Sequence, residues 1–248
     1  MVVEVAIVLS YLFGGTLIYR ATREHHLGQY AFFHSYLIYF LATGVLGWIV
    51  DIWIHSYFAL FFWLRFFTLV IAEFALLIQI GDRVFASYPL LRRLARWLTL
   101  GITAGFALFY ILPPLLHTRP SEVAVFDLVL RSALAKGVVI LLLVVLAGYF
   151  HIALGRNIMA MTAGLMCYLM INVANFALVE RLGWESYGKA FATLGPLSQA
   201  LMVLIWLVGL WNYEALPAPP PPGFAGGHEA LPSRIVRYNT TLDRLFRR

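Results

Sequence analysis

The sequence predicts an all-α polytopic membrane protein with seven transmembrane helices. Of the 248 residues, 62% are hydrophobic and only 12% are charged, whereas an ordinary soluble domain carries roughly 25% charged residues. Apolar runs of about 20 residues, long enough to cross a hydrocarbon core of ~30 Å, recur along most of the chain. These runs are continuous rather than alternating, which favours helices over the strands of a membrane barrel.

The first and last spans show how each boundary is assigned. The first run has Glu4 before it and Arg20 after it, and it lacks the positive start and cleavage site of a signal peptide. We therefore expect a retained helix. The last run contains Pro196, which removes a backbone donor and predicts a kink. The expected spans are residues 2–19, 31–53, 58–82, 94–112, 124–149, 157–179 and 189–211.

Two of the spans carry small residues at spacings that allow close approach between helices. The second span has Gly44 and Gly47, and the fourth has Gly101 and Gly105 at the small-xxx-small spacing. These glycines favour helix packing, with a dimer face as the weaker alternative.

Orientation follows from the distribution of Lys and Arg between alternate loops, because basic residues accumulate on the cytoplasmic side. One side of the predicted bundle carries Arg20, Arg23, Arg83, Arg92, Arg93, Arg96, Arg156, Arg234, Arg237, Arg244, Arg247 and Arg248. The other side carries only Arg119, Arg181 and Lys189. We therefore expect the N-terminus outside and the C-terminus in the cytoplasm, with the chain in a bacterial inner membrane.

Three parts follow one another along the chain. Residues 1–213 form the seven-helix domain, and residues 214–232 are a Pro- and Gly-rich linker that cannot pack a core. Residues 233–248 are expected to form a short amphipathic helix whose basic residues are Arg234, Arg237, Arg244, Arg247 and Arg248. Such a helix favours docking on anionic lipids, with docking on a protein partner as the alternative.

Ionisable residues inside the apolar spans predict a functional site, because charges in hydrocarbon are costly. Counting depth along the helices predicts a deep ion pair between Glu73 and Lys136. It also predicts an outer polar pocket lined by Asp51, Arg65, Asp127, Arg131, Asn172, Asn175 and Gln199. Three interpretations stay open: a structural ion network, a cavity for an anionic or carbonyl-bearing ligand, and an ion or proton path through the deep pair.

Several chemistries lack the residues they need. A retinal Schiff base requires a lysine in the middle of the last span, but Lys189 lies at its outer end. The histidines lack the paired spacing of haem-binding helices, and the adjacent His25 and His26 cannot point at one metal from a helical face. The single cysteine, Cys167, excludes an internal disulfide. No catalytic or nucleotide-binding motif occurs, so we expect no enzyme activity, cofactor or metal.

Two segments resemble a group of uncharacterised bacterial seven-helix integral membrane proteins. They are GDRVFASYPLLRRLARWL, which follows Glu73 and contains the YPxLRRL-like turn, and RSALAKGVVILLLVVLAG, which starts with the Arg131–Ser132 pair. The resemblance implies a seven-helix inner-membrane fold and carries no function with it.

Two classes of function fit these observations. The first is a non-enzymatic membrane protein that senses a ligand in the outer pocket or serves as an accessory subunit, with the C-terminal helix docking on a protein partner. The alternative is a small transporter of an anionic or polar solute, for which inverted repeats and broken helices are expected. No internal repeat is visible, and only Pro196 interrupts a helix.

Overall fold

A computed structural model describes residues 2–111 and 122–212, without the side chains of residues 59, 110, 111 and 122–127. The elements are α1 (Val2–Arg23), α2 (Ala31–Trp53), the 3-10 turn η1 (His55–Tyr57), α3 (Phe58–Val84), α4 (Pro89–Phe106), the π-helical segment η2 (Ala107–Ile111), α6 (Glu122–Tyr149), α7 (Arg156–Leu182) and α8 (Trp184–Gly209). No strand occurs in these two segments, so the described chain is all-helical as predicted.

Six of the described helices, α1, α2, α3, α6, α7 and α8, are long and apolar enough to cross a membrane. The chain is therefore a multi-pass membrane protein. The helix expected over 94–112 instead begins at Pro89, because the fixed φ of proline suits the first turn of a helix. That earlier start adds Arg92 and Arg93 to the helix, which already contained Arg96, and α4 falls outside the set of six.

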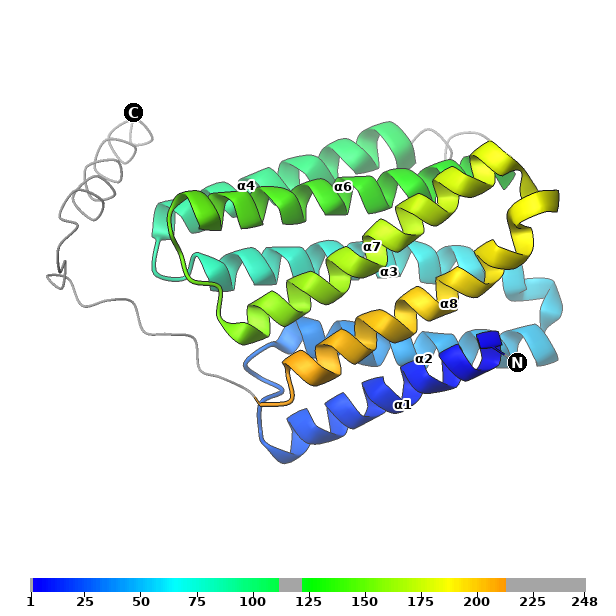
Figure 1. Ribbon diagram of the computed structural model, residues 1–248, viewed down its shortest axis with the longest axis horizontal. Helices are drawn as coiled ribbons and strands as arrows, with labels where there is room; N and C mark the ends of the chain where they lie inside the picture. The colour runs from blue at the N-terminus through cyan, green and yellow to red at the C-terminus, as the bar shows by residue number, and fades with distance from the viewer. Residues whose placement is uncertain (1, 112–121, 213–248) are drawn as a thin grey trace, which may run out of the picture.

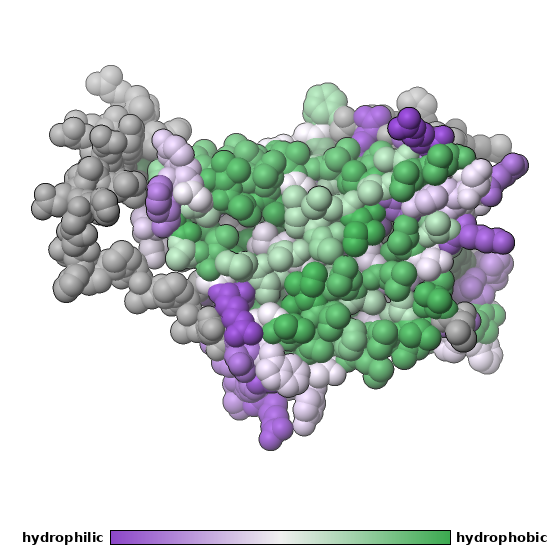
Figure 2. Space-filling view, viewed as in Figure 1, coloured by the Kyte–Doolittle hydropathy of each residue, from purple (hydrophilic) through white to green (hydrophobic). Residues whose placement is uncertain are grey.

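The helices lie side by side with short connections at both ends of the bundle (Figure 1). Residues 24–30, 85–88 and 150–155 connect helices at what we call the Arg92 end. The η1 turn and Gly183 connect them at the opposite end, which we call the Asp51 end. Figure 2 shows a broad apolar surface between hydrophilic side chains that gather toward the two ends, as expected for a bundle bordered by lipid.

Helix α3 packs against four other helices, α2, α4, α6 and α7. Its buried residues recur every three or four positions, as in Val70, Phe74, Leu77 and Ile80. Glu73 lies on this same stripe and is only 6% exposed. The periodic face that fills the core therefore carries the acidic side chain inward.

Helices α7 and α8 approach each other closely because two glycines leave room. A Cβ at Gly164 would overlap the indole of Trp206, and a Cβ at Gly209 would overlap Ala160. The Trp206 indole N–H donates to the Met161 carbonyl over 3.1 Å and is fully buried. This contact anchors the end of α8 that precedes the C-terminal segment.

Candidate functional site

The deep ion pair predicted from the sequence is present between neighbouring helices α3 and α6. Lys136 Nζ donates to Glu73 Oε2, and the Tyr36 hydroxyl from α2 donates to Glu73 Oε1 over 3.3 Å. All three side chains are buried, with Lys136 5% and Tyr36 2% exposed. Because the carboxylate has a cation and a hydrogen-bond donor, its burial is compensated.

Arg65, in contrast, lies against α2 where Gly44 and Gly47 leave space because they have no side chains, and we call this space the α2 notch. Its guanidinium nitrogens lie near the places that a Cβ would take at Gly44 and Gly47, 3.6 and 3.9 Å away. The Tyr11 hydroxyl from α1 occupies the same notch at Gly44. The two glycines thus make room inside the bundle for a cation and a phenol, rather than forming a dimer face.

Arg65 has no acidic partner or hydrogen-bond acceptor among the side chains that the structure describes, and its buried Nε makes no hydrogen bond there. A guanidinium presents five N–H donors in a planar fork that matches a carboxylate or phosphate. In a protein interior, such unsatisfied donors are costly. This arrangement favours an acceptor other than the side chains that the structure describes.

Two tyrosines connect Arg65 with the deep ion pair. Tyr36 and Tyr168 each lie within electrostatic reach of both Glu73 and Arg65. Tyr168 also forms a side-chain hydrogen bond with Gln199 of α8. We call Tyr36, Arg65, Glu73, Lys136, Tyr168 and Gln199 the central polar cluster. Counting Arg65 and Lys136 as cations, Glu73 as an anion and the two tyrosines as neutral, the cluster has a net charge of +1.

The outer pocket is not assembled as the sequence predicted. Asp51 pairs with His55, four residues later, over 2.9 Å, and both side chains are exposed. Arg131 is exposed on α6, and the side chain of Asp127 lies outside the described residues. Arg131 is five residues from Lys136, so the two are about 140° apart around the helix and cannot face the same core.

Two of the amide side chains expected in the pocket, those of Asn172 and Asn175, instead form hydrogen bonds between α7 and α8. The Asn172 amide donates to the Tyr168 carbonyl over 2.7 Å and to the Ser198 hydroxyl over 3.4 Å. The Asn175 amide donates to the Phe191 carbonyl over 3.2 Å, in the helical turn before Pro196. These bonds lie close to Pro196 of α8, but the Asn175 side-chain oxygen is buried without a hydrogen-bond partner among the described residues.

Sequence reasoning missed Tyr11, Tyr36 and Tyr168 because a tyrosine in an apolar span looks like an ordinary packing residue. Ser132 had a usable signal, since it lies one turn before Lys136 on the same face of α6. Its hydroxyl is buried and has no hydrogen-bond partner among the described residues.

The arginines expected to dock on lipid or a partner all fall in residues 213–248, outside the described part.

No group of three or more His, Cys, Asp or Glu side chains in residues 2–111 and 122–212 has a geometry that could hold a metal ion. The central polar cluster offers guanidinium, ammonium, carboxylate, phenol and amide groups, which can recognise a ligand by charge and by hydrogen bonds. No protein-family model matches the chain, and no curated protein or solved structure is significantly similar to it.

Proposed function

We propose that this protein is a non-enzymatic integral membrane protein, a ligand sensor or accessory subunit, that binds an anionic or carbonyl-bearing group at Arg65. One observation carries the proposal: Lys136 already neutralises Glu73, whereas Arg65 has no acidic partner among the described residues. A bound anion would balance the net charge of the central polar cluster. Bidentate hydrogen bonds to the guanidinium would add orientation as well as affinity.

Depth within the bundle supports entry from the Asp51 end. Arg65 lies seven residues after Phe58, the first residue of α3, which corresponds to roughly 10 Å along a helix. Glu73 lies eight residues deeper on the same helix. A solute that reached Arg65 would meet Tyr11 at the α2 notch before the ion pair. The proposed site thus includes fewer of the residues expected from the sequence, because it leaves out Asp51 and Arg131.

The proposed topology has seven spans, with α4 and η2 together forming the additional one. Among the described residues, seven arginines lie at the Arg92 end: Arg20, Arg23, Arg83, Arg92, Arg93, Arg96 and Arg156. The distribution of basic residues favours a cytoplasmic location for that end. The N-terminus would then lie outside a bacterial inner membrane, and the basic segment 233–248 would dock on anionic lipid or a cytoplasmic protein partner.

Anion-dependent stabilisation tests the ligand proposal. The purified full chain in mild detergent is heated with chloride, phosphate, acetate, or neutral acetamide, at constant ionic strength. At least one of these should raise the midpoint of thermal unfolding in the wild-type protein and fail to do so in Arg65→Gln. Arg131→Gln is the matched control, because it removes the same charge from an exposed position. Equal responses in the wild-type protein and Arg65→Gln would refute the proposal.

A second variant separates ligand binding from folding. Arg65→Lys keeps the charge but loses the planar fork of donors. It should fold like the wild-type protein and respond more weakly to the carboxylate or phosphate that stabilises the wild type. A response equal to that of the wild type would show that charge alone acts there.

The alternative function, a small transporter of an anionic or polar solute, is favoured by the proline inside α8, which removes one backbone donor although the helix runs on from Trp184 to Gly209. Pro196 lies within that helix, three residues from Gln199 of the central polar cluster. Helices broken next to a polar site are typical of transporters. Solute flux through the purified protein in liposomes would support this alternative. A stoichiometric protein partner that co-purifies in mild detergent would support the sensor or accessory subunit.

A further inference from the structure

A basic hollow lies at the Arg92 end of α4. It has a volume of about 340 Å³, and its lining includes Arg92, Arg93, Arg96, Trp97 and Leu100. We propose that this hollow binds the headgroup phosphate of an anionic phospholipid, with one acyl chain lying along the outer face of α4. The proposal does not depend on ligand binding at Arg65.

The charges of the hollow are held in place by α3. Arg92 Nε and Arg96 Nη2 bind the two carboxylate oxygens of Asp82, at 3.0 and 2.5 Å. Arg93 has no acidic partner among the described side chains and is exposed. The hollow therefore combines three cations with one anion. Such a net positive site at the end of α4, which belongs to the additional span of the proposed topology, matches the headgroup of an anionic lipid.

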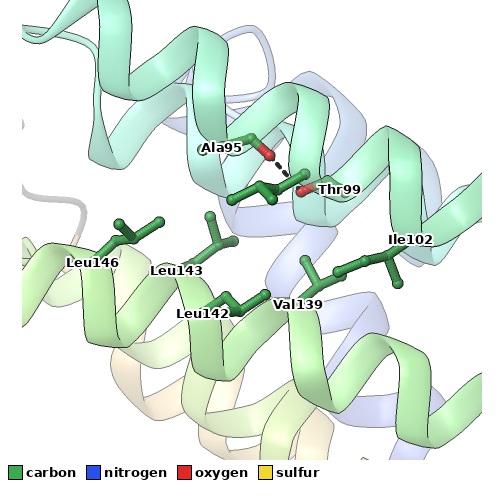
Figure 3. A pocket seen from close by; sticks show the side chains of 8 residues that line it. Ala95, Thr99, Ile102, Val139, Leu142, Leu143 and Leu146 are labelled. Atoms are coloured by element: carbon green, nitrogen blue, oxygen red, sulfur yellow. Dashed lines mark hydrogen bonds between the residues drawn. The ribbon is translucent and has the colours of Figure 1, made fainter.

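The opposite face of α4 is already occupied by protein. Ala95 and Thr99 are each 2% exposed, and with Ile102 they face Leu143 and Val139 of α6 (Figure 3). The space left between the two helices is only about 10 Å³. This interface fixes the rotation of α4 about its axis, so that its other face points away from the bundle.

The outward face provides a path for an acyl chain. Arg93, Trp97, Gly101 and Gly105 follow one another at a spacing of four residues, so they lie along one side of α4. A Cβ added at Gly101 or Gly105 would meet no atom of the described residues within 4 Å. Gly101 and Gly105, which the sequence analysis expected to favour helix packing, thus leave a shallow surface next to the Trp97 side chain.

The aromatic side chain favours a lipid over a free anion. Trp97 lines the hollow and is 67% exposed, between the arginines and the glycines. Tryptophan prefers the level at which headgroups meet acyl chains. A soluble phosphate would use only the arginines, whereas a phospholipid would use the arginines, the indole and the apolar surface beyond it.

Native mass spectrometry of the full chain in mild detergent tests the proposal. Phosphatidylglycerol and phosphatidylcholine with identical acyl chains are added at equal concentrations, and glycerol phosphate serves as the soluble headgroup. The wild-type protein should retain phosphatidylglycerol preferentially. Arg93→Gln should weaken that binding about fivefold, the effect of one basic residue near an anionic surface. Arg23→Gln, an exposed arginine of α1 at the same end, is the matched control.

The C-terminal arginines are competing sites for the same lipid. The measurement is therefore repeated with glutamine at Arg234, Arg237, Arg244, Arg247 and Arg248. In this background, Arg93→Gln should still lower phosphatidylglycerol binding about fivefold relative to the same background with Arg93 present. If the protein with the five C-terminal arginines replaced, but with Arg93 present, no longer prefers phosphatidylglycerol, the proposal is overturned. An Arg93→Gln effect no larger than that of Arg23→Gln would overturn it as well.

The acyl-chain path is tested by filling it. The double variant Gly101→Leu, Gly105→Leu should weaken phosphatidylglycerol binding and leave any binding of glycerol phosphate unchanged. A wild-type protein that binds glycerol phosphate as tightly as phosphatidylglycerol would show a simple anion site and refute the lipid. Conversion of a wild-type dimer to a monomer by the leucines, with unchanged lipid binding, would assign the face to a second copy of the chain.

Discussion

Glu73 and Arg65 lie on the same helix, eight residues apart, yet their surroundings differ. Each oxygen of the Glu73 carboxylate accepts a hydrogen bond, one from the Lys136 ammonium group and one from the Tyr36 hydroxyl. The Arg65 guanidinium lies between glycines and a tyrosine, without an acidic partner among the described residues. The difference separates a charge that stabilises the bundle from a charge available to a ligand. Five single variants and one double variant break or sharpen this comparison, and the single changes are taken in decreasing order of their expected effect on stability.

Removing one member of the deep pair should have the largest effect. Glu73→Leu leaves Lys136 buried without its counter-ion and should lower the free energy of unfolding by about 3 to 5 kcal/mol. Lys136→Met should behave similarly for the reverse reason. The change is measured by thermal or chemical unfolding in mild detergent. A loss below 1 kcal/mol would mean that water reaches the pair.

The double variant Glu73→Leu, Lys136→Met is the control for the single changes. Replacing both partners with apolar side chains of similar size removes the uncompensated charge, so the double variant should be more stable than either single variant. Additive losses in the double variant would show that the two side chains do not interact.

Tyr36→Phe should have an intermediate effect. It removes the second donor to the carboxylate while the ion pair stays, so the loss of stability should be about 1 kcal/mol, the contribution of one hydrogen bond. The same unfolding assay measures it. If Tyr36→Phe costs as much as Glu73→Leu, the tyrosine rather than the lysine is the main partner of the carboxylate.

Arg65→Met should alter stability less than Glu73→Leu in the absence of a ligand, because no described acidic group loses a partner. The same change should abolish stabilisation by whichever anion acts on the wild-type protein. Unfolding midpoints with and without that anion measure both effects. A loss of stability as large as that of Glu73→Leu would mean that Arg65 has a structural role, and the comparison between the two charges would fail.

Arg131→Met should have the smallest effect, since this exposed side chain lies on the outer side of α6. Neither the unfolding midpoint nor the anion response should differ measurably from those of the wild-type protein. A reduced anion response would return Arg131 to the ligand site and would require α6 to rotate relative to α3.

The depth of each residue in the membrane could be counted along its helix from the sequence. The angular position of each side chain around the helix axis was considered only in part. Counting residues placed Arg65 and Arg131 at one level, and it correctly brought Glu73 to Lys136. The separation of about 140° between Arg131 and Lys136 was available from spacing alone. The pairing of Asp51 with His55 could not be read from helix spacing, because Asp51 is in the last turn of α2 and His55 lies beyond its end, in η1.

The sequence by itself determined that the chain is an all-helical, multi-pass membrane protein, since apolar runs and their interruptions are local properties of the chain. It also singled out Glu73 and Lys136, because charges within such runs are rare and need partners. Only the tertiary structure decided that Tyr36 completes this pair, that Gly44 and Gly47 make room for Arg65, and that the glycines of α4 stay uncovered. These features depend on which helices become neighbours and how each is rotated about its axis, and both follow from packing between distant segments.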